Sequence, residues 1–382
     1  MHWVLFLVAL GWVGYAVWGR RWRVEPMLER AYPGEWGRVV AVVPARNEAL
    51  ELPVTLPCLL RQTYGDFHVV LVDDHSTDNT AAVAEQLARE YGAEGRFHLV
   101  QPPPLPEGWM GKVWAQRAGY EEARRLGAAW IWFTDADIRH EPDVLERLLT
   151  TAERWERDFV SVMARLRTDT LAEKLLIPAF TYFFAMLYPF HRIARDELAD
   201  AGAAGGCMLV RKELLERAGG IDAIRDAVID DVALAKACKR AGGRLWLGYH
   251  PGVQSTRSYG SLGAIWAMVA RSAYTQLNYN PLLLAVCVFG LFVVFVWPAL
   301  ALLGFAAGRK LWGLVAVLAM ARTYLPFVRY LGCGSLWSLT LPVAATLYTA
   351  MTVTSAWWYY RGTRTRWKGR EYGRSEPPVA LR

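Results

Sequence analysis

Three long stretches without a charged side chain constrain this sequence more than any other feature. Residues 3–18, 272–308 and 330–360 contain no Asp, Glu, Lys or Arg and are rich in apolar side chains. Because about 20 apolar residues cross a bilayer as a helix, each stretch is a candidate transmembrane segment. The chain is 382 residues long and 54% hydrophobic. That composition excludes an intrinsically disordered protein, and the length fits one large or two ordinary folded domains.

The formal net charge of +7 is concentrated near the two ends of the chain. Residues 20–30 carry a net charge of +2 and residues 361–374 a net charge of +5, so the remainder is neutral overall. This distribution argues against a nucleic-acid partner, which requires a basic binding face. Both basic stretches adjoin apolar runs, and basic flanks stay on the cytoplasmic side of a membrane. We therefore expect a multi-pass protein of the cytoplasmic (inner) membrane, with its soluble domain in the cytoplasm.

Residues 3–18 indicate an uncleaved N-terminal anchor helix, because no basic segment precedes them and two arginines follow. Residues 175–190 form a shorter uncharged run that Pro178 interrupts. This run is short for a span, so we favour a helix in the membrane interface over a buried helix. The five cysteines are scattered without a C-x-x-C pair, which indicates neither a zinc site nor a disulfide framework.

The C-terminal apolar region poses a problem of parity. If residues 282–307, 311–330 and 335–357 all cross the membrane, the basic tail lies opposite the soluble domain, against the positive-inside rule. The middle segment also carries Arg322 and Arg329. A charge at mid-bilayer costs about 2.5–3.5 kcal/mol on insertion scales. We therefore expect the middle segment to be interfacial or re-entrant and the other two to span.

Between residues 38 and 250, short apolar runs alternate with helical stretches. The runs predict strands over residues 39–43, 68–72, 97–100 and 130–133. Helices are predicted over residues 48–62, 80–91 and 112–126. Such alternation is typical of an α/β fold with a mainly parallel sheet and helices on both faces. Ligands of these folds bind beyond the carboxyl ends of the strands.

The sharpest local motif is Asp135-Ala136-Asp137, at the end of the strand predicted over 130–133. If the chain is still extended there, the two carboxylates project to one face. Two close carboxylates repel each other unless a proton or a cation intervenes. A Mg²⁺ or Mn²⁺ ion relieves that repulsion and can hold a diphosphate, although a solvated turn explains most isolated D-x-D sequences.

A second acidic pair, Asp73-Asp74, follows the strand predicted over 68–72. Capping of the next helix explains the Ser, Thr and Asn residues that come after the pair, but not two acids at the strand end itself. A carboxylate at that place can accept a hydrogen bond from the N–H of a base.

Three further positions have both a chemical and a purely structural interpretation. Lys112 opens a helix where an anion would bind, although the spacing is not that of a P-loop. Gly205-Gly206 indicates close approach of the backbone to a ligand, or only a bulge. Asp230-Asp231 opens another helix. Capping explains one of these acids, and the second is a candidate general base.

Taken together and in this order, these segments resemble family 2 glycosyltransferases of the GT-A fold. Within that family the sequence is most similar to the hopene-associated glycosyltransferases, and more distantly to ceramide glucosyltransferases. The resemblance runs from about residue 39 to residue 281, with similar flanking membrane segments. It is carried by VVPARNE, VLVDDHSTDNT, GWMGKVWA, TDADI, LLIPAFTYFFAMLYPF, GAAGGCMLVRKELLERAGGI, VIDDVALAKACKRAG and WKGREY.

The resemblance implies a role for each acidic motif. Asp74, or Asp73 beside it, would contact the nucleotide base. Asp135 would contact the ribose and lie near the metal, and Asp137 would ligate Mg²⁺ or Mn²⁺ on the diphosphate. Asp231 would deprotonate the acceptor hydroxyl, with Asp230 beside it.

The resemblance also implies a set of residues around the donor. These donor-binding residues are Pro44, Arg46, Glu48, Lys112, Gly205 and Gly206. One motif departs from the family, because relatives carry Q-x-x-R-W whereas residues 268–272 keep only the arginine, Arg271. We place Arg271 with the donor-binding residues, its role open. The departure weakens the interpretation as a processive polysaccharide synthase.

We therefore expect an inverting, metal-dependent transfer of one sugar from a nucleotide-diphosphate sugar, a UDP-sugar by the resemblance, to a lipid hydroxyl such as that of a hopanoid. A polyprenyl-phosphate glycosyltransferase, a processive synthase and a non-catalytic nucleotide-sugar-binding scaffold remain alternatives. The expected partners are the donor, the lipid acceptor and the bilayer, with no nucleic acid and no obligate protein. The expected divisions are 1–20 (anchor), 36–255 (GT-A domain), 256–280 (active-site segment), 281–360 (membrane region) and 361–382 (cytoplasmic tail).

Overall fold

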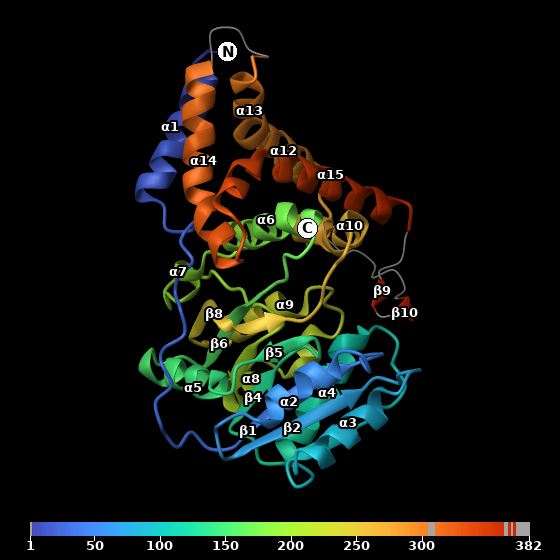
Figure 1. The fold of residues 1–382 in the computed structure, drawn as a ribbon. Coiled ribbons are helices and arrows are strands. Elements are labelled where there is room, and N and C mark those ends of the chain that lie inside the picture. Colours follow the sequence, from blue (N-terminus) through green and yellow to red (C-terminus); the bar gives the residue numbers. More distant parts are fainter. Residues whose placement is uncertain (1, 305–309, 363–365, 368–369, 372–382) are drawn as a thin grey trace.

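An eight-stranded sheet forms the centre of the soluble domain (Figure 1). The computed structural model describes residues 2–304, 310–362, 366–367 and 370–371. The strands, in chain order, are β1 Val39–Ala45, β2 Phe67–Asp73, β3 Phe97–Val100, β4 Trp130–Phe133, β5 Ile138–His140, β6 Phe159–Arg165, β7 Met208–Arg211 and β8 Leu245–Ser255. Their spatial order is β3-β2-β1-β4-β7-β6-β8-β5. The four strands predicted from the apolar runs are all present, longer by up to two residues at an end.

The first half of the sheet is parallel, as the alternation of strands and helices predicts. β1 pairs in parallel with β2 and with β4, and β2 with β3. The second half is mixed, because β7 runs antiparallel to β4 and β6, and β5 antiparallel to β8. In register, Ala45 lies opposite Asp73, so the carboxyl ends of β1 and β2 meet at one edge of the sheet.

Helices cover both faces of the sheet, and the sequence of β1 shows why. Val39, Ala41 and Val43 belong to one buried apolar cluster, and Val40 and Val42 belong to the other. Period-2 alternation with apolar residues on both faces is typical of a strand buried on both sides. The helices of the domain are α2 Leu52–Leu60, α3 Thr80–Glu90, α4 Gly111–Arg125, α5 Val144–Arg154, α8 Lys212–Arg217, the 3₁₀ turn η1 Ile221–Ile224 and α9 Asp230–Arg240.

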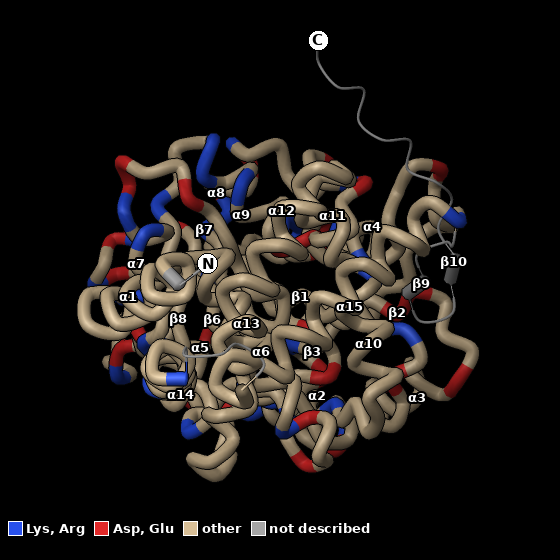
Figure 2. The backbone as a smooth tube through the Cα atoms, turned by 90° about the horizontal axis from the view of Figure 1, so that it is seen from above, with Lys and Arg blue, Asp and Glu red and all other residues tan. Residues whose placement is uncertain are grey.

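A second layer of apolar helices stands on one end of this domain (Figure 1). Its elements are α1 His2–Trp18, α6 Leu171–Leu187, α7 Phe190–Ile193, α10 Leu262–Ala270, α11 Ala273–Gln276, α12 Pro281–Leu291, the π-helical turn η2 Phe292–Val296, α13 Trp297–Leu302, α14 Lys310–Tyr330, the 3₁₀ turn η3 Ser335–Thr340 and α15 Leu341–Tyr360. Along the described chain, four helical stretches are long and apolar enough to cross a membrane: Leu171–Ile193, Pro281–Leu302, Lys310–Tyr330 and Ser335–Tyr360. Viewed from above, these helices show few charged residues (Figure 2).

The middle segment, expected to be interfacial or re-entrant, forms a helix that is long and apolar enough to cross a membrane. α14 is one unbroken helix that packs along α1, with the rings of Phe6 and Trp312 4.7 Å apart at the end far from the domain. Its two arginines lie toward the domain, where the Arg322 guanidinium stacks over Trp22 at 4.5 Å. Arg322 and Arg329 therefore lie toward the end of α14 that is near the soluble domain. A charge near the end of a membrane helix can reach water more easily than one at its centre.

α15 is the helix that lies crosswise in the structure, as α6 does (Figure 1). It follows the domain-proximal end of α14, and at its own end the hydroxyl of Tyr360 contacts that of Tyr274 on α11 at 3.0 Å. In its middle, Tyr348 donates a hydrogen bond to the carbonyl of Leu176 on α6. Both ends of α15 thus lie toward the domain, whereas α14 extends away from it. Which of the C-terminal helices cross the membrane stays a prediction. Most of the tail 361–382 lies outside the described residues, apart from β9 Arg366–Trp367 and β10 Arg370–Glu371.

Candidate active site

The carboxyl ends of β1 and β2 are tied together by Arg46. Its guanidinium donates to the backbone carbonyls of Asp74 and His75, and lies 3.8 Å from the Asp74 carboxylate. In the other direction, the Asp74 N–H donates to the carbonyl of Ala45 at 2.8 Å. Pro44 is the last but one residue of β1. The predicted donor-binding residues of the first two strands therefore share one edge of the sheet.

The two acids at the end of β2 are both buried. Asp74 has no exposed surface, and Asp73 is 7% exposed. One carboxylate oxygen of Asp73 accepts the N–H of Ser76 at 3.1 Å, as a turn-forming aspartate does. The Asp74 side chain is therefore enclosed by protein, and Asp73 is the one of the two acids with some surface exposed to solvent.

The Asp135-Ala136-Asp137 motif forms a turn between β4 and β5. The sequence-based premise that the chain is still extended here is wrong, because β4 ends at Phe133. The Thr256 N–H anchors the turn from the end of β8 by donating to the carbonyl of Asp137 at 2.8 Å. Both carboxylates nevertheless remain close enough to interact. Burial, and then the charges of Asp135 and Glu48, raise the pKa of Asp137 to about 6.

Lys112 connects this turn to the start of α9. Its ammonium group lies 2.8 Å from Asp135 and 3.1 Å from Asp230. It sits in the first turn of α4, where the free backbone N–H groups also favour an anion. Burial opposes the charge on Lys112, but the carboxylates of Asp135 and Asp230 outweigh that effect and raise its pKa above the ordinary value.

Asp230 and Asp231 are adjacent in sequence but differ in surroundings. Asp230 also accepts a hydrogen bond from Gln116 at 2.9 Å. Although burial acts to raise it, Lys112 and Gln116 lower the pKa of Asp230. Asp231 instead accepts the Gly205 N–H at 2.8 Å, and burial together with the charge of Asp230 raises its pKa to about 7. Environments that separate two pKa values in this way are typical of acid–base sites.

Gly205 passes so close to these groups that a side chain has little room. A Cβ atom placed there lies 3.3 Å from Lys112 Nζ and 3.4 Å from Asp231 Oδ2. At Gly206, a Cβ atom lies 3.1 Å from the side chain of Ile138. The backbone of the glycine pair therefore lies close to protein side chains, and its approach to a ligand stays a prediction.

Three contributors were not among the residues predicted from the sequence. Gln116 lies one turn beyond Lys112 on α4, so helical spacing alone could have indicated it. Arg257 follows β8 and its charge acts to lower the pKa of Asp137. Glu173 belongs to a capping box with Thr170, which is a local signal for the start of α6, but nothing local indicates its bonds to the segment that follows Arg257.

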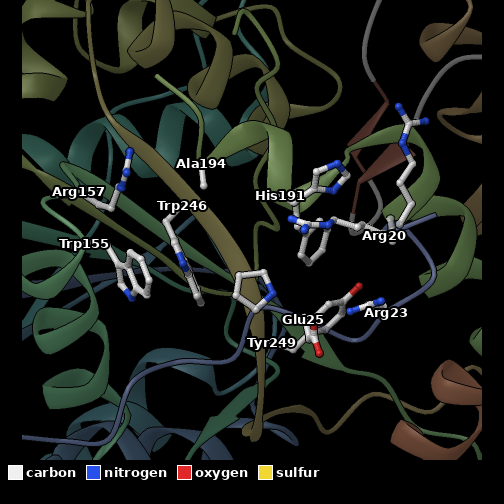
Figure 3. Close-up of a pocket in the computed structure, with 13 residues that line it drawn as sticks. Arg20, Arg23, Glu25, Trp155, Arg157, His191, Ala194, Trp246 and Tyr249 are labelled. Carbon is white, nitrogen blue, oxygen red and sulfur yellow. The ribbon is translucent and has the colours of Figure 1, made fainter. Parts of the chain in front are cut away.

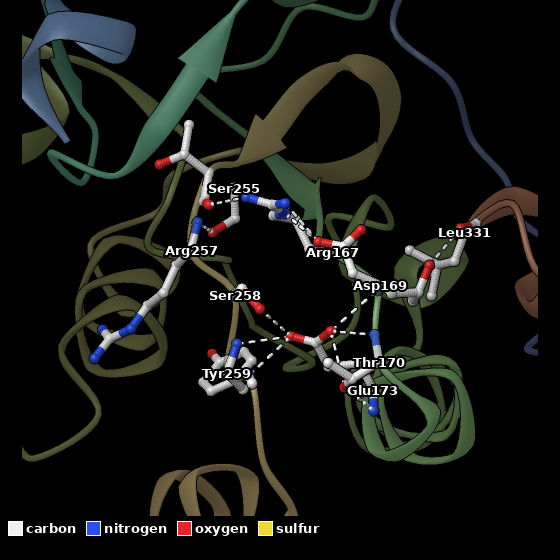
Figure 4. Close-up of polar contacts among 12 residues, drawn as sticks. Arg167, Asp169, Thr170, Glu173, Ser255, Arg257, Ser258, Tyr259 and Leu331 are labelled. Carbon is white, nitrogen blue, oxygen red and sulfur yellow. Dashed lines mark hydrogen bonds and ion pairs between the residues drawn. The ribbon is translucent and has the colours of Figure 1, made fainter. Parts of the chain in front are cut away.

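Glu173 is a buried carboxylate that serves two segments at once (Figure 4). One oxygen caps α6 by accepting the N–H groups of Asp169 at 3.0 Å and Thr170 at 2.9 Å. The other accepts the Ser258 hydroxyl at 2.9 Å and the Tyr259 N–H at 2.7 Å. The segment after β8 is therefore fixed between the apolar helix α6 and the Asp135–Asp137 turn.

Arg271 is a predicted site residue that the structure does not bring into the contacts around Lys112. It is exposed at the end of α10, and forms no ion pair with a carboxylate in the described chain. Its charge still reaches Tyr259, where burial raises the pKa and Arg257 and Arg271 oppose the rise.

The two aspartates of the turn fit a divalent cation. Their mutual repulsion, visible in the raised pKa of Asp137, is what a hard cation with oxygen ligands relieves. Across the described residues, no group of three or more His, Cys, Asp and Glu side chains is placed to hold a metal alone. A metal here would take its other ligands from a diphosphate and water, as Mg²⁺ often does.

Comparison with known proteins identifies the domain that holds this site. Residues 40–219 match the family model described as Glycosyl transferase family 2. This match covers just under half of the chain, which is therefore similar to family 2 glycosyltransferases over these residues. The match includes the Asp73–Asp74, Lys112, Asp135–Asp137 and Gly205–Gly206 positions and ends before α9.

Individual relatives match smaller parts of this chain. Amylovoran biosynthesis glycosyltransferase AmsB of Erwinia amylovora is 32% identical over 115 residues, which is 30% of this chain and 36% of that protein. Polyprenol monophosphomannose synthase of Mycolicibacterium smegmatis is 29% identical over 116 residues, 30% of this chain and 41% of that protein. In both cases the chain spans well under two thirds of the relative's own length.

A solved structure extends the likeness of the fold. The mannosyltransferase PcManGT from Pyrobaculum calidifontis, in complex with GDP-Man and Mn²⁺, matches 93% of this chain and 99% of its own, with a TM-score of 0.55 at 20% identity. At that identity the two share the fold. The expected GT-A-like α/β fold of the family 2 domain, with apolar C-terminal helices, is thereby confirmed.

Proposed function

We propose that this protein transfers one sugar, with inversion, from a nucleotide-diphosphate sugar to a lipid hydroxyl at the membrane. The observation that carries the proposal is the contact set around Lys112, which bonds Asp135 and Asp230 while Gly205 holds Asp231 beside them. Four separate segments thus bring together the Lys112 ammonium group, the candidate base Asp231 and the Asp135 carboxylate, beside which we place the diphosphate. Following the resemblance to hopene-associated enzymes, we propose a UDP-sugar as donor and a hopanoid-type lipid as acceptor.

In the proposed reaction Asp231 is the general base. The acceptor hydroxyl oxygen attacks the anomeric carbon, the new C–O bond forms as the bond to the diphosphate breaks, and the electron pair leaves with the diphosphate. Asp231 takes the hydroxyl proton at its carboxylate, and a pKa of about 7 suits a base that works near neutral pH. Attack opposite the leaving group inverts the anomeric centre.

Lys112 stabilises the charge that develops on the leaving diphosphate. Its pKa, raised by two carboxylates, keeps it protonated throughout. Asp135 and Asp137 would hold a Mg²⁺ or Mn²⁺ ion, which supplies positive charge to the diphosphate oxygens when bound. We place the nucleotide at the edge formed by β1 and β2, with Pro44, Arg46, Glu48, Asp73 and Asp74 around the base.

A lipid acceptor is supported by the position of the proposed base below the apolar helices. The segment from Gly202 to Gly205 runs from the Tyr188 ring at the end of α6 to the Asp231 carboxylate. The Tyr188 hydroxyl in turn donates to Gln276 on α11 at 2.7 Å. A few residues of chain therefore separate the proposed base from two helices of the apolar layer. We propose that this layer sits in the inner membrane, with residues 36–255 in the cytoplasm and 256–280 completing the site.

A second candidate, transfer to a polyprenyl phosphate, is favoured by one observation. The relative from M. smegmatis is named a polyprenol monophosphomannose synthase. A phosphate acceptor is already ionised at neutral pH and does not strictly require a base. Loss of activity in Asp231→Asn would therefore separate the two candidates.

The deciding experiment uses the full chain in lipid nanodiscs with a panel of nucleotide sugars. Lipid products are identified by mass spectrometry, with hydroxyl lipids and polyprenyl phosphate offered in parallel. We expect one sugar to be added to a hydroxyl lipid, and Asp231→Asn to abolish that transfer. Asp226→Asn, an exposed acid on the loop before α9, is the matched control. Transfer only to polyprenyl phosphate, or products with several sugars, would contradict the proposal.

A further inference from the structure

A basic cavity lies on another side of the apolar helices, where α1 ends. Its volume is about 500 Å³, within the range of small-ligand sites. Figure 3 shows Arg157, Trp155 and Trp246 on one side, and Arg20, Arg23 and His191 on the other. The cavity therefore combines an aromatic wall with a cluster of cations.

The wall that carries the arginines is fixed by specific contacts. The segment from Pro26 to Leu28, which follows Glu25, pairs with Tyr249 of β8. The Tyr249 N–H donates to the carbonyl of Pro26 at 2.8 Å, and the Leu28 N–H donates to the carbonyl of Tyr249 at 3.1 Å. Arg21 donates to the carbonyl of Met186 at the end of α6 at 3.2 Å. Backbone pairing and the Arg21 bond therefore fix this wall of the cavity in place.

The cations in this cavity are incompletely neutralised. Four arginines and one acid, Glu25, line it. Arg157 pairs with Asp196 at 2.6 Å, but its Nε is buried and has no acceptor among the described residues. Over the same described ranges, Arg20 and Arg23 form no ion pair with a carboxylate. Arginine side chains with free donors are well suited to bind phosphate oxygens.

The position of the cavity separates it from the reaction site. Asp231 lies at the start of α9, whereas Lys239 near the end of that helix donates to the carbonyl of Arg195, just beyond α7. Eight residues of helix correspond to about 12 Å. The cavity instead adjoins the end of α1, where Arg20 and Arg23 follow the last apolar turn, at the level of lipid headgroups.

We propose that this cavity binds the phosphodiester headgroup of an anionic phospholipid. Arg20 and Arg23 would contact the phosphate, the charge of Arg157 at the cavity wall would add to theirs, and Trp246 would cover the glycerol portion. The acyl chains would leave along α1 and α6, which are apolar. Such binding would fix the domain against the membrane without using the proposed transfer chemistry.

The test is native mass spectrometry of the full chain in uncharged detergent. Phosphatidylglycerol and phosphatidylcholine with identical acyl chains are titrated separately. We expect phosphatidylglycerol to bind more tightly, and Arg20→Gln with Arg23→Gln to weaken it about 30-fold, since each basic residue contributes roughly fivefold. Arg21 is left in place because of its bond to Met186. The matched control, Arg89→Gln with Arg240→Gln, removes two exposed arginines elsewhere and should leave the affinity within about twofold.

A variant with the opposite expected sign excludes a general structural fault. Glu25→Gln removes the acid of the cavity and should tighten phosphatidylglycerol binding about fivefold. Equal affinity for the two lipids, or unchanged binding in the Arg20 and Arg23 variant, would overturn the proposal. Displacement of phosphatidylglycerol by millimolar inorganic phosphate, at matched ionic strength, would overturn it in favour of a site for a free anion.

Discussion

The backbone N–H of Gly205 donates a 2.8 Å hydrogen bond to the carboxylate of Asp231. This bond fixes the position of one carboxylate oxygen. The other oxygen accepts the N–H of Val232, in the N-terminal turn of α9, at 2.8 Å. The proposed base is therefore held in one orientation by two backbone groups. Its position depends on how closely the chain at residue 205 can approach.

Gly205→Ala tests that dependence. An added methyl group lies 3.3 Å from Lys112 Nζ and 3.4 Å from Asp231 Oδ2, which is tighter than most such contacts. We expect kcat to fall about 10- to 100-fold with little change in melting temperature, because small displacements at reacting groups are costly. Gly95→Ala is the matched control, since nothing lies within 4 Å of a Cβ atom there. Unchanged kcat would show that residue 205 does not set the geometry of the base.

The pH dependence of transfer should report Asp231. Its base form is the ionised one and its pKa is about 7, so kcat/KM should fall as the pH drops below 7 and level off above. Asp231→Asn should lower kcat about 10²- to 10⁴-fold. Burial and Asp230 raise the pKa of Asp231, so ionisation of this group destabilises the fold as the pH rises toward 7. The melting temperature of Asp231→Asn at pH 8 should therefore not decrease, which separates lost catalysis from lost folding.

Asp230→Asn offers an internal check on the same profile. Removing the neighbouring negative charge should lower the pKa of Asp231, so the acidic limb of kcat/KM should move to lower pH. The overall rate should also fall, because Lys112 loses one of its two carboxylate partners. An acidic limb that stays in place would show that another group titrates in it.

Removal of divalent metal should abolish transfer if Asp135 and Asp137 form the proposed metal site. We expect EDTA to stop the reaction and Mn²⁺ or Mg²⁺ to restore it. Asp137→Asn should weaken Mn²⁺ binding, measured by electron paramagnetic resonance with nucleoside diphosphate present. Loss of an outer-shell partner alone costs about 10- to 100-fold in affinity, so loss of a ligand should cost at least as much. Full activity in EDTA would exclude a metal requirement.

Glu173 should act on the donor site from the apolar layer. Glu173→Gln leaves the helix cap partly intact but weakens the bonds to Ser258 and Tyr259, which hold the segment after Arg257. Hydrogen bonds to a charged group are worth about 1.5–3 kcal/mol. We expect the KM for the donor to rise about tenfold with a smaller change in kcat. Glu85→Gln on the exposed face of α3 is the control, and a proportional fall in kcat alone would contradict a positioning role.

Sequence reasoning placed the predicted site through one topological rule and failed where contacts are long-range. Asp73 and Asp135 could be placed at one edge of the sheet because β2 and β4 both run parallel to β1, which lies between them, and the carboxyl ends of parallel strands meet at one edge. No such rule connects Glu173 to Tyr259, which are 86 residues apart and meet through tertiary packing. Hydropathy measures how long and apolar a segment is, not how it is oriented. The sequence shows that α14 carries two arginines, but the stacking of Arg322 on Trp22 is visible only in the structure.

The crosswise position of α15 gives a final prediction, on topology. In a variant with all five cysteines replaced by serine, single cysteines are introduced at Ser335, Arg361 and Leu303 and tested with a membrane-impermeant maleimide. If α15 lies along the membrane surface, Ser335→Cys and Arg361→Cys are labelled from the same face as Glu85→Cys on the soluble domain. Leu303→Cys, exposed beyond the end of α13, is labelled from the opposite face. Labelling of the Ser335 and Arg361 variants from opposite faces would mean that α15 spans, and the basic tail would then lie across the membrane from the domain, against the positive-inside rule.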